Sequence, residues 1–236
     1  ASYKLQNPLN AQLASAELVR RVVRHLLPHA PPVIAERSRA TLDHALDAIV
    51  RSTDRMKRLV DDLLTSTRLA AGKLPVRKEP VDPARVLTEA HATLDAYACR
   101  HHVHVDLEVE RGLPNVEGDG DRLVQVITHL LHNALNFTPE GGHVHLRVRR
   151  AEGQVRLAVE DEGPGVAPEE RAHLFERFWQ GRERAYVRAG LELYISKGIM
   201  EVFGGRMEVE SARGHGTCFR VDLPMLKAVA AAPAAG

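Results

Sequence analysis

The sequence predicts an α+β protein in which an N-terminal helical hairpin precedes an α/β sandwich with a mixed sheet. Two observations lead to this prediction. Apolar residues follow a heptad spacing in the first third of the chain, and helical and strand patterns alternate after it. Charge changes at the same place, because residues 1–74 carry twelve basic and seven acidic side chains (+5), whereas residues 75–236 carry twenty and twenty-four (−4). We therefore expect a boundary near residue 75.

Composition excludes several classes of protein. The 236 residues are 44% hydrophobic and 27% charged, which is typical of a globular protein. Lys and Arg (32) nearly balance Asp and Glu (31), and aromatic residues make up only 4%, so no nucleic-acid binding is predicted. Cys99 and Cys218 are too few for a disulfide framework and favour a reducing, cytoplasmic compartment. The sequence has neither a long apolar run nor a signal-peptide pattern, so we expect no direct membrane contact by this segment.

Residues 1–74 contain two apolar seams whose spacings alternate between three and four. The stronger seam predicts a long helix and consists of Leu42, Leu46, Ile49, Thr53, Met56, Val60, Leu63 and Thr67. The weaker seam predicts a helix before it and consists of Leu5, Leu9, Gln12, Ala16, Val19, Val23 and Leu26. Pro28, Pro31 and Pro32 separate the two helices, and Gly72 ends the second. Because heptad seams require partner helices, we expect a dimeric four-helix bundle; the alternative is a hairpin packed on its own C-terminal domain.

A second domain is expected over residues 83–226, after a linker at 75–82 and before a flexible tail at 227–236. The helices expected in it span residues 83–98, 121–136, 168–176 and 190–203. The strands expected in it span residues 103–109, 143–149, 154–160, 206–211 and 217–223. The late strands occur in hairpins, which favours a mixed sheet over a doubly wound parallel one.

Four segments of this domain carry residues suited to a phosphate-bearing ligand. Asn133 lies one helical turn before the Thr138–Pro139 exit, where its amide could reach a phosphate-bound metal. Asp161 ends a strand, so its carboxylate can accept a hydrogen bond from an exocyclic amine, while Gly163 and Gly165 admit a flat base.

The other two segments are an aromatic stretch at 174–179 and the glycine that opens a helix at Gly190. Free N–H groups at such a helix start can hold phosphate oxygens, and a turn at 214–217 follows later in the chain. Taken singly, each segment is equally compatible with an ordinary core helix or turn.

In this order and spacing, the segments resemble the ATP-binding domain of sensor histidine kinases, the Bergerat (GHKL) fold. The stretches similar to its N, G1, F and G2 boxes and the turn after them are 129–139, 161–165, 175–178, 190–193 and 214–217. Residues 2–9 and 55–64 resemble the family's H box and second dimerisation helix, so the resemblance covers residues 2–224.

The resemblance implies that ATP with Mg²⁺ is the cofactor. It makes Asn133 the magnesium ligand and Asp161 the adenine acceptor. The positions it places at the nucleotide are Asn133, Asn136, Asp161, Gly163, Gly165, Phe178, Gly190, Leu191, Glu192 and Thr217.

The phosphoacceptor position departs from the family pattern. Tyr3 stands where the family has its histidine, and Lys4 replaces the adjacent acid. A phenol with a pKa of about 10 is almost fully protonated near neutral pH, and a phosphotyrosine ester lacks the transfer potential of a phosphoramidate. We therefore expect no histidine autophosphorylation and assign no catalytic residue.

The nucleotide site departs from the pattern as well. Glu192 replaces the second glycine of the G2 box, adding charge and bulk beside the expected phosphates, although the helix dipole stabilises it by roughly 0.3–1 kcal/mol. His129 replaces the first asparagine of the N box, and Asn136 replaces a basic residue near the phosphates. The expected lid, Trp179–Ala189, is only eleven residues long and lacks the usual flanking glycines.

These departures lead to the hypothesis of a degenerate histidine kinase core, a pseudokinase that signals by conformation. The resemblance implies a homodimer through the hairpin and a response regulator or partner kinase as its partner. An active kinase or phosphatase that acts in trans, another GHKL ATPase, and a scaffold without ligand remain alternatives. Labelling of a partner would identify the kinase or phosphatase that acts in trans. Steady ATP turnover without a phosphoprotein would identify another GHKL ATPase, and absence of nucleotide binding would identify a scaffold.

Overall fold

The computed structural model describes residues 11–12, 14–19, 21, 32–179 and 190–226. The chain divides into two units, Ala1–Thr67 with Arg184–Ala189 and Arg68–Glu183 with Gly190–Gly236, and each is described by itself. Within the described ranges, no helix combines the length and apolar character that crossing a bilayer requires.

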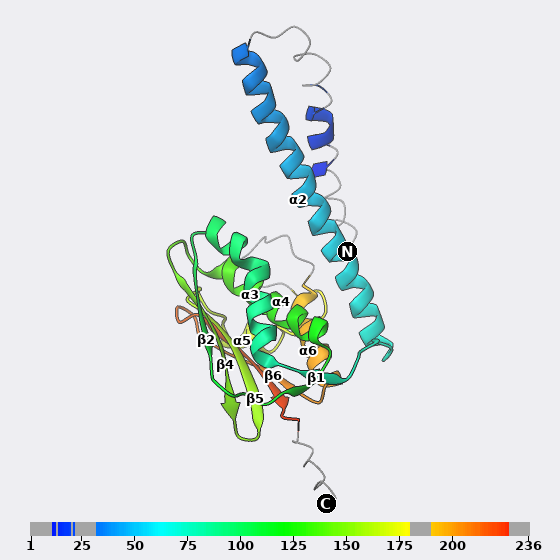
Figure 1. The fold of residues 1–236 in the computed structure, drawn as a ribbon, viewed down its shortest axis with the longest axis vertical. Coiled ribbons are helices and arrows are strands. Elements are labelled where there is room, and N and C mark those ends of the chain that lie inside the picture. Colours follow the sequence, from blue (N-terminus) through cyan, green and yellow to red (C-terminus); the bar gives the residue numbers. More distant parts are fainter. Residues whose placement is uncertain (1–10, 13, 20, 22–31, 180–189, 227–236) are drawn as a thin grey trace, which may run out of the picture. The chain divides into compact units, whose positions relative to one another are not determined.

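The first unit is helical, as the seams predict. Its main element is helix α2 (Pro32–Ala70), and the described residues between 11 and 21 are helical as well (Figure 1). Pro32 opens α2, where its missing N–H group costs nothing. Gly72 ends the helix with a positive φ of 63°, which lets the N–H of Lys73 donate to the carbonyl of Arg68 (2.9 Å).

The heptad seam of α2 stays largely accessible within this one chain. Leu46 is 45% exposed and Val60 is 42% exposed. The buried residues Ala45, Ser52 and Leu59 follow a spacing of seven on a different face of the helix. The apolar seam therefore offers surface to a further helix.

The second unit is built on a five-stranded sheet of order β2-β4-β5-β7-β6. Its strands are β2 (His104–Val109), β4 (His143–Ala151), β5 (Gln154–Asp161), β6 (Arg206–Ser211) and β7 (Thr217–Pro224). β2 runs parallel to β4 and every other pairing is antiparallel, so the sheet is mixed, as predicted.

Helices α3 (Pro83–Arg100), α4 (Gly120–Phe137) and α6 (Glu192–Val202) cover one face of this sheet (Figure 1). The side chains that β4 turns toward these helices, Val144, Leu146 and Val148, are at most 1% exposed. α4 buries its apolar stripe against them, and this stripe comprises Leu123, Val126, Ile127, Leu130, Leu131, Ala134 and Leu135. The other face of the sheet is left to charged side chains.

Three elements differ from the sequence prediction. The helix expected at 168–176 is only α5 (Pro168–Arg171), because the chain continues in turns with hydrogen bonds between residues three apart, such as Glu176 N–H to the His173 carbonyl (2.9 Å). The segment expected as a linker at 75–82 contains strand β1 (Glu79–Val81), which pairs antiparallel with β3 (Val116–Gly118). A proline such as Pro80 argues against a strand, because it has no N–H group to donate. In a two-stranded ribbon both strands are edge strands, so this missing donor costs nothing.

Asp119 ties the segment just before β1 to the start of α4. Its Oδ2 accepts a hydrogen bond from the backbone N–H of Arg77 (3.0 Å), and its Oδ1 accepts one from Arg122 N–H (3.4 Å) as the helix N-cap. Burial alone raises the pKa of this carboxyl group, but the two backbone hydrogen bonds and the Arg77 and Arg122 charges outweigh it and hold the pKa below its ordinary value.

Replacing Asp119 should therefore destabilise the fold in a pH-dependent way. We expect Asp119→Ala to lower the free energy of unfolding by about 1–2 kcal/mol near neutral pH. Because the folded pKa is depressed, the contribution is present above the unfolded pKa of about 4 and is lost as pH falls through the folded value. Urea unfolding at neutral and acidic pH measures this, with Asp95→Ala on the exposed side of α3 as the control. Equal losses in the two variants would contradict the assignment.

Candidate functional site

The site begins where α4 ends. Asn133 is half-buried near the C-terminus of the helix, one turn before the chain leaves it at Thr138. The Thr138 hydroxyl donates to the Ala134 carbonyl (2.9 Å) and closes the last turn ahead of Pro139. Asn133 thereby lies near the end of a helix whose other face is anchored in the core.

The side chain of Asn136, three residues further along α4, forms hydrogen bonds with α3 and with its own helix. Its Oδ1 accepts a hydrogen bond from the Tyr97 hydroxyl of α3 (2.7 Å), and its Nδ2 donates to the His132 carbonyl. Tyr97 in turn stacks on His101 and meets the edge of His132. The amide that replaces a basic residue of the family pattern thus links α4 to α3.

Asp161 lies at the end of β5, 5% exposed, with its carboxylate folded over the following loop. Its Oδ1 accepts a hydrogen bond from the Gly163 N–H (2.8 Å). A Cβ placed on Gly163 would lie 2.7 Å from this oxygen and 3.0 Å from the carbonyl oxygen of Phe137. Glycine is therefore required for the loop to lie directly against the end of α4.

The same loop is held from its other side by the turn before β7. The Gly214 N–H donates to the Pro164 carbonyl (2.7 Å). Cβ atoms placed on Gly165 and Gly216 would each lie 1.9 Å from a backbone oxygen, that of Ala212 and that of Asp161 respectively. These two glycines also have φ values of 68° and 71°.

Thr217 lies beside Asp161, because the two residues are partners in the β5–β7 register. The hydroxyl groups of Thr217 and Ser211 are 3.0 Å apart, and Ser211 also donates to the Gly216 carbonyl (2.7 Å) and accepts from the Val166 N–H (2.8 Å). Ser211 therefore cross-links the loop after β5 to the turn before β7, a role that no sequence motif indicated.

The aromatic segment 174–179 also contacts Gly190, the glycine before α6. The Phe178 N–H donates to the Gly190 carbonyl (2.9 Å), so the described residues on either side of 180–189 are joined. Phe178 has a φ of 65°, which is strained for an aromatic residue, and its ring is 45% exposed. Nearly all of the expected lid, Trp179–Ala189, lies outside the described residues.

Glu192 is the first residue of α6, and Leu191 before it is the N-cap, 1% exposed and without a side-chain cap bond. One turn later, the Ser196 hydroxyl donates to the Glu192 carbonyl (2.7 Å) and lies 3.2 Å from Nδ1 of His129 on α4. His129 therefore joins α4 to α6, and Ser196, like Tyr97, is a contact that the sequence analysis missed.

Most of the expected site residues thus lie in two backbone assemblies. One holds Asp161, Gly163, Gly165 and Thr217 against the end of α4, and the other joins Phe178 to Gly190. Asn136 is turned toward α3, while Tyr3 and Lys4 lie outside the described residues. In the part of the chain that the structure describes, no three His, Cys, Asp or Glu side chains come together as a metal site.

The chain matches two models of protein families. Residues 118–227 match the model for histidine kinase-, DNA gyrase B- and HSP90-like ATPases, and residues 1–72 match the His Kinase A (phospho-acceptor) domain. The sensor protein DivL of Caulobacter vibrioides is 34% identical over 223 residues, which cover 94% of this chain and 27% of DivL.

Solved structures of histidine kinases are also similar over large parts of the chain. The crystal structure of full-length ShkA in complex with AMPPNP has a TM-score of 0.67 and 29% identity, covering 97% of this chain and 45% of that one. The mycobacterial sensor histidine kinase MprB has a TM-score of 0.55 and 30% identity, covering 63% of this chain and 98% of that one.

This chain belongs to the sensor histidine kinases and carries their phospho-acceptor and ATPase regions, as its sequence resemblance implies. It spans about a quarter of the length of DivL and less than half of the ShkA chain.

The contacts between the loop after β5 and the turn before β7 can be tested with three alanine substitutions. Gly214→Ala adds only backbone strain, because nothing lies within 4 Å of its Cβ position, and should cost about 1–2 kcal/mol. Gly165→Ala and Gly216→Ala add a clash with backbone and should each cost more than about 3 kcal/mol. Thermal unfolding measures the difference, and equal destabilisation by all three would contradict this close backbone approach.

Proposed function

We propose that this chain is a degenerate histidine kinase core that does not phosphorylate itself and that signals by conformation and partner binding. The single observation that carries the proposal is Tyr3, within the matched phospho-acceptor region, where the family has its histidine. Lys4 beside it removes the acid that would assist proton transfer. This argument rests on the sequence, since both residues lie outside the described ones.

The chemistry of the two side chains supports this proposal. A neutral imidazole nitrogen is nucleophilic near neutral pH, whereas a phenol must first lose a proton with a pKa of about 10. A phosphotyrosine ester, once formed, would also not transfer its phosphoryl group readily to an aspartate. Tyr3 is therefore a poor acceptor and a poor donor.

The adenine side of the nucleotide site is retained. Asp161 is buried, its Oδ1 accepts a hydrogen bond from the Gly163 N–H, and the glycines around it let the neighbouring loops pack closely about the carboxylate. Asn133 stands at the end of α4 with an amide oxygen of the type that Mg²⁺ accepts. ATP with Mg²⁺, when bound, supplies a transferable γ-phosphoryl group. These residues fit the base and the metal, and this fit favours retained nucleotide binding.

The residues expected beside the phosphates suit a triphosphate less well. Glu192 opens α6, the helix start that would face the phosphates, and Asn136 is held by Tyr97 instead of presenting a cation. At an effective dielectric constant of about 20, a carboxylate about 5 Å from one phosphate charge costs about 3 kcal/mol. We infer that this site binds adenine nucleotides weakly and disfavours the triphosphate.

The expected partners follow from the hairpin, residues 1–74. Its partly exposed heptad seam suits a second copy of the chain, which would complete a four-helix bundle. Its net charge of +5 suits an acidic partner, and for this family we propose a response regulator or a partner kinase. The nearly balanced overall charge gives no support to nucleic acid as a partner.

A second candidate function is phosphoryl transfer to another protein. Retention of Asn133 and Asp161 favours it, because a chain that had become a scaffold alone would have no need of either. Incubation with a family member that keeps its histidine but lacks ATPase activity separates the two, since only transfer in trans labels that partner.

Purified chain incubated with [γ-³²P]ATP and Mg²⁺ should remain unlabelled. Acid treatment distinguishes the possible products, because phosphohistidine is labile in acid and phosphotyrosine is stable. Label that survives acid and disappears in Tyr3→Phe, or acid-labile label on a hairpin histidine, would contradict the proposal. The Tyr3→His, Lys4→Glu double variant then reports whether the ATP site itself is competent.

Removing the Glu192 side chain should restore nucleotide affinity. We expect Glu192→Gly to bind Mg²⁺–ATP at least about tenfold more tightly, by isothermal titration, because about 3 kcal/mol of repulsion is partly screened. Glu192→Gln separates charge from bulk, and Glu201→Gln, exposed on the same helix, serves as the control. An unchanged affinity in Glu192→Gly would show that the carboxylate is not the block.

A further inference from the structure

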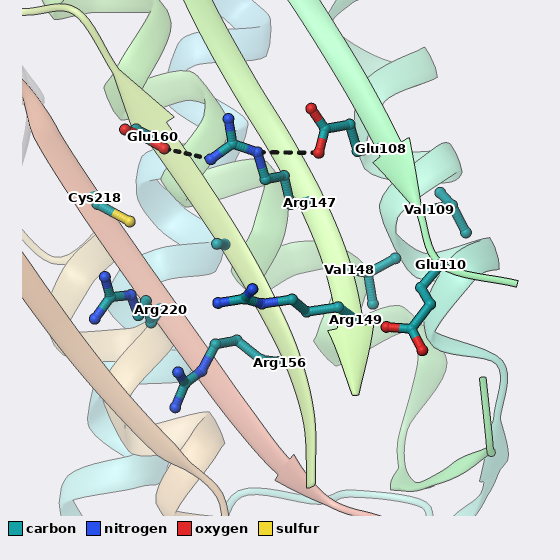
Figure 2. Close-up of a pocket in the computed structure, with 11 residues that line it drawn as sticks. Glu108, Val109, Glu110, Arg147, Val148, Arg149, Arg156, Glu160, Cys218 and Arg220 are labelled. Carbon is teal, nitrogen blue, oxygen red and sulfur yellow. Dashed lines mark hydrogen bonds and ion pairs between the residues drawn. The ribbon is translucent and has the colours of Figure 1, made fainter. Parts of the chain in front are cut away.

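The face of the five-stranded sheet that the helices leave open contains a hollow of about 520 Å³. Four arginines surround it: Arg147 and Arg149 on β4, Arg156 on β5 and Arg220 on β7 (Figure 2). Its volume lies within the range of about 300–1,000 Å³ typical of sites for small molecules. It shares no residue with the nucleotide site.

The strand register explains why a hollow forms here. Ala158 on β5 is the direct partner of Arg147 on one side and of Arg220 on the other, so a methyl group separates two long side chains. Cys218, the next small residue, lies half-buried on β7. Small side chains at the middle of the sheet thus make the floor, and arginines make the wall.

The same register places two like charges opposite each other. Arg149 and Arg156 are direct partners across the antiparallel β4–β5 pair. Like charges in this position destabilise a sheet unless something neutralises them. Asp222 does so for Arg156, whereas Arg149 has no ion-pair partner among the residues that the structure describes. The pair therefore leaves one positive charge beside the hollow.

Carboxylates hold the other arginines in fixed orientations. Asp222 accepts from Nε and Nη2 of Arg156, at 2.7 Å each, and Arg147 lies between Glu108 (3.2 Å) and Glu160 (2.6 Å). Arg220 is paired with Glu210 on β6 (2.6 Å). A guanidinium has five N–H donors, so each of these arginines keeps donors for another acceptor. Such preorganised groups lose little entropy when a ligand binds.

We propose that this hollow binds a phosphorylated sugar or a similar phosphate monoester with hydroxyl groups. A tetrahedral phosphate presents several oxygens to guanidinium groups arriving from three strands, whereas a single carboxylate presents only two. Glu108 and Glu110 line the β2 side of the hollow and would repel a second anionic end, but they can accept hydrogen bonds from sugar hydroxyls. The charge pattern therefore favours a ligand with one anionic and one polar neutral end.

Titration of the full chain with glucose 6-phosphate tests this proposal, because that probe has no adenine and is a poor ligand for the nucleotide site. Arginine Nε–Hε NMR signals should shift with a Kd below about 1 mM, and added salt should weaken binding. Arg149→Gln should weaken it at least about fivefold. Arg206→Gln, an exposed arginine of β6 outside the hollow, should change it less than about twofold.

Cys218 provides a second readout. Burial raises the pKa of its thiol, so alkylation is slow and best followed near pH 8.5. In a Cys99→Ser background, bound glucose 6-phosphate should slow alkylation of Cys218 severalfold, while glucose should not.

Four results would overturn the proposal. The first is the absence of both NMR shifts and thiol protection at about 10 mM probe. The second is equal binding of inorganic phosphate and glucose 6-phosphate, which would indicate anion binding without a sugar subsite. The third is binding that Arg149→Gln leaves intact. The fourth is a preference for an acidic peptide over the sugar phosphate, which would indicate a protein-docking surface.

Discussion

The alternation of apolar and charged side chains along the strands is the constraint on which the rest of the second unit depends. It places Val144, Leu146 and Val148 under the helices, and the direct neighbours of these residues on the open face. Burial of such a side chain contributes roughly 1.5–3 kcal/mol, so a slip of one residue in register is strongly disfavoured. The fixed register then aligns the end of β5 with the end of α4, and this alignment creates the site.

The shape of that site depends on the backbone more than on its chemically active side chains. Gly165 and Gly216 allow two turns to approach closely, and the contacts of Ser211 with both turns are independent of the residue at position 192. Substitutions such as Glu192 can therefore alter phosphate binding while the fold persists. The backbone shape of the site therefore does not depend on the charge at position 192.

The two faces of the sheet share β5. Asp161 at the end of this strand belongs to the candidate site at the end of α4, and Ala158, three residues earlier, forms the floor of the arginine-lined hollow. The ionic contacts of the open face span all five strands: Arg147 joins β4 to β2 and β5, Arg156 joins β5 to β7, and Arg220 joins β7 to β6. A ligand on the open face would thus contact the strand that ends at Asp161.

The sequence alone determined the helical first unit, the mixed sheet and the family, because heptad spacing, strand alternation and spaced glycine motifs are local patterns. It also predicted that Asp161 ends a strand and that Gly163, Gly165 and Thr217 lie in or beside glycine turns, since strand ends and glycine turns are readable in sequence. Only the tertiary structure decided that Asn136 faces Tyr97, that Ser196 contacts His129, and that Pro80 lies in a strand. The arginine-lined hollow likewise required the register of β4, β5 and β7, because contacts between residues distant in sequence depend on how the chain is packed.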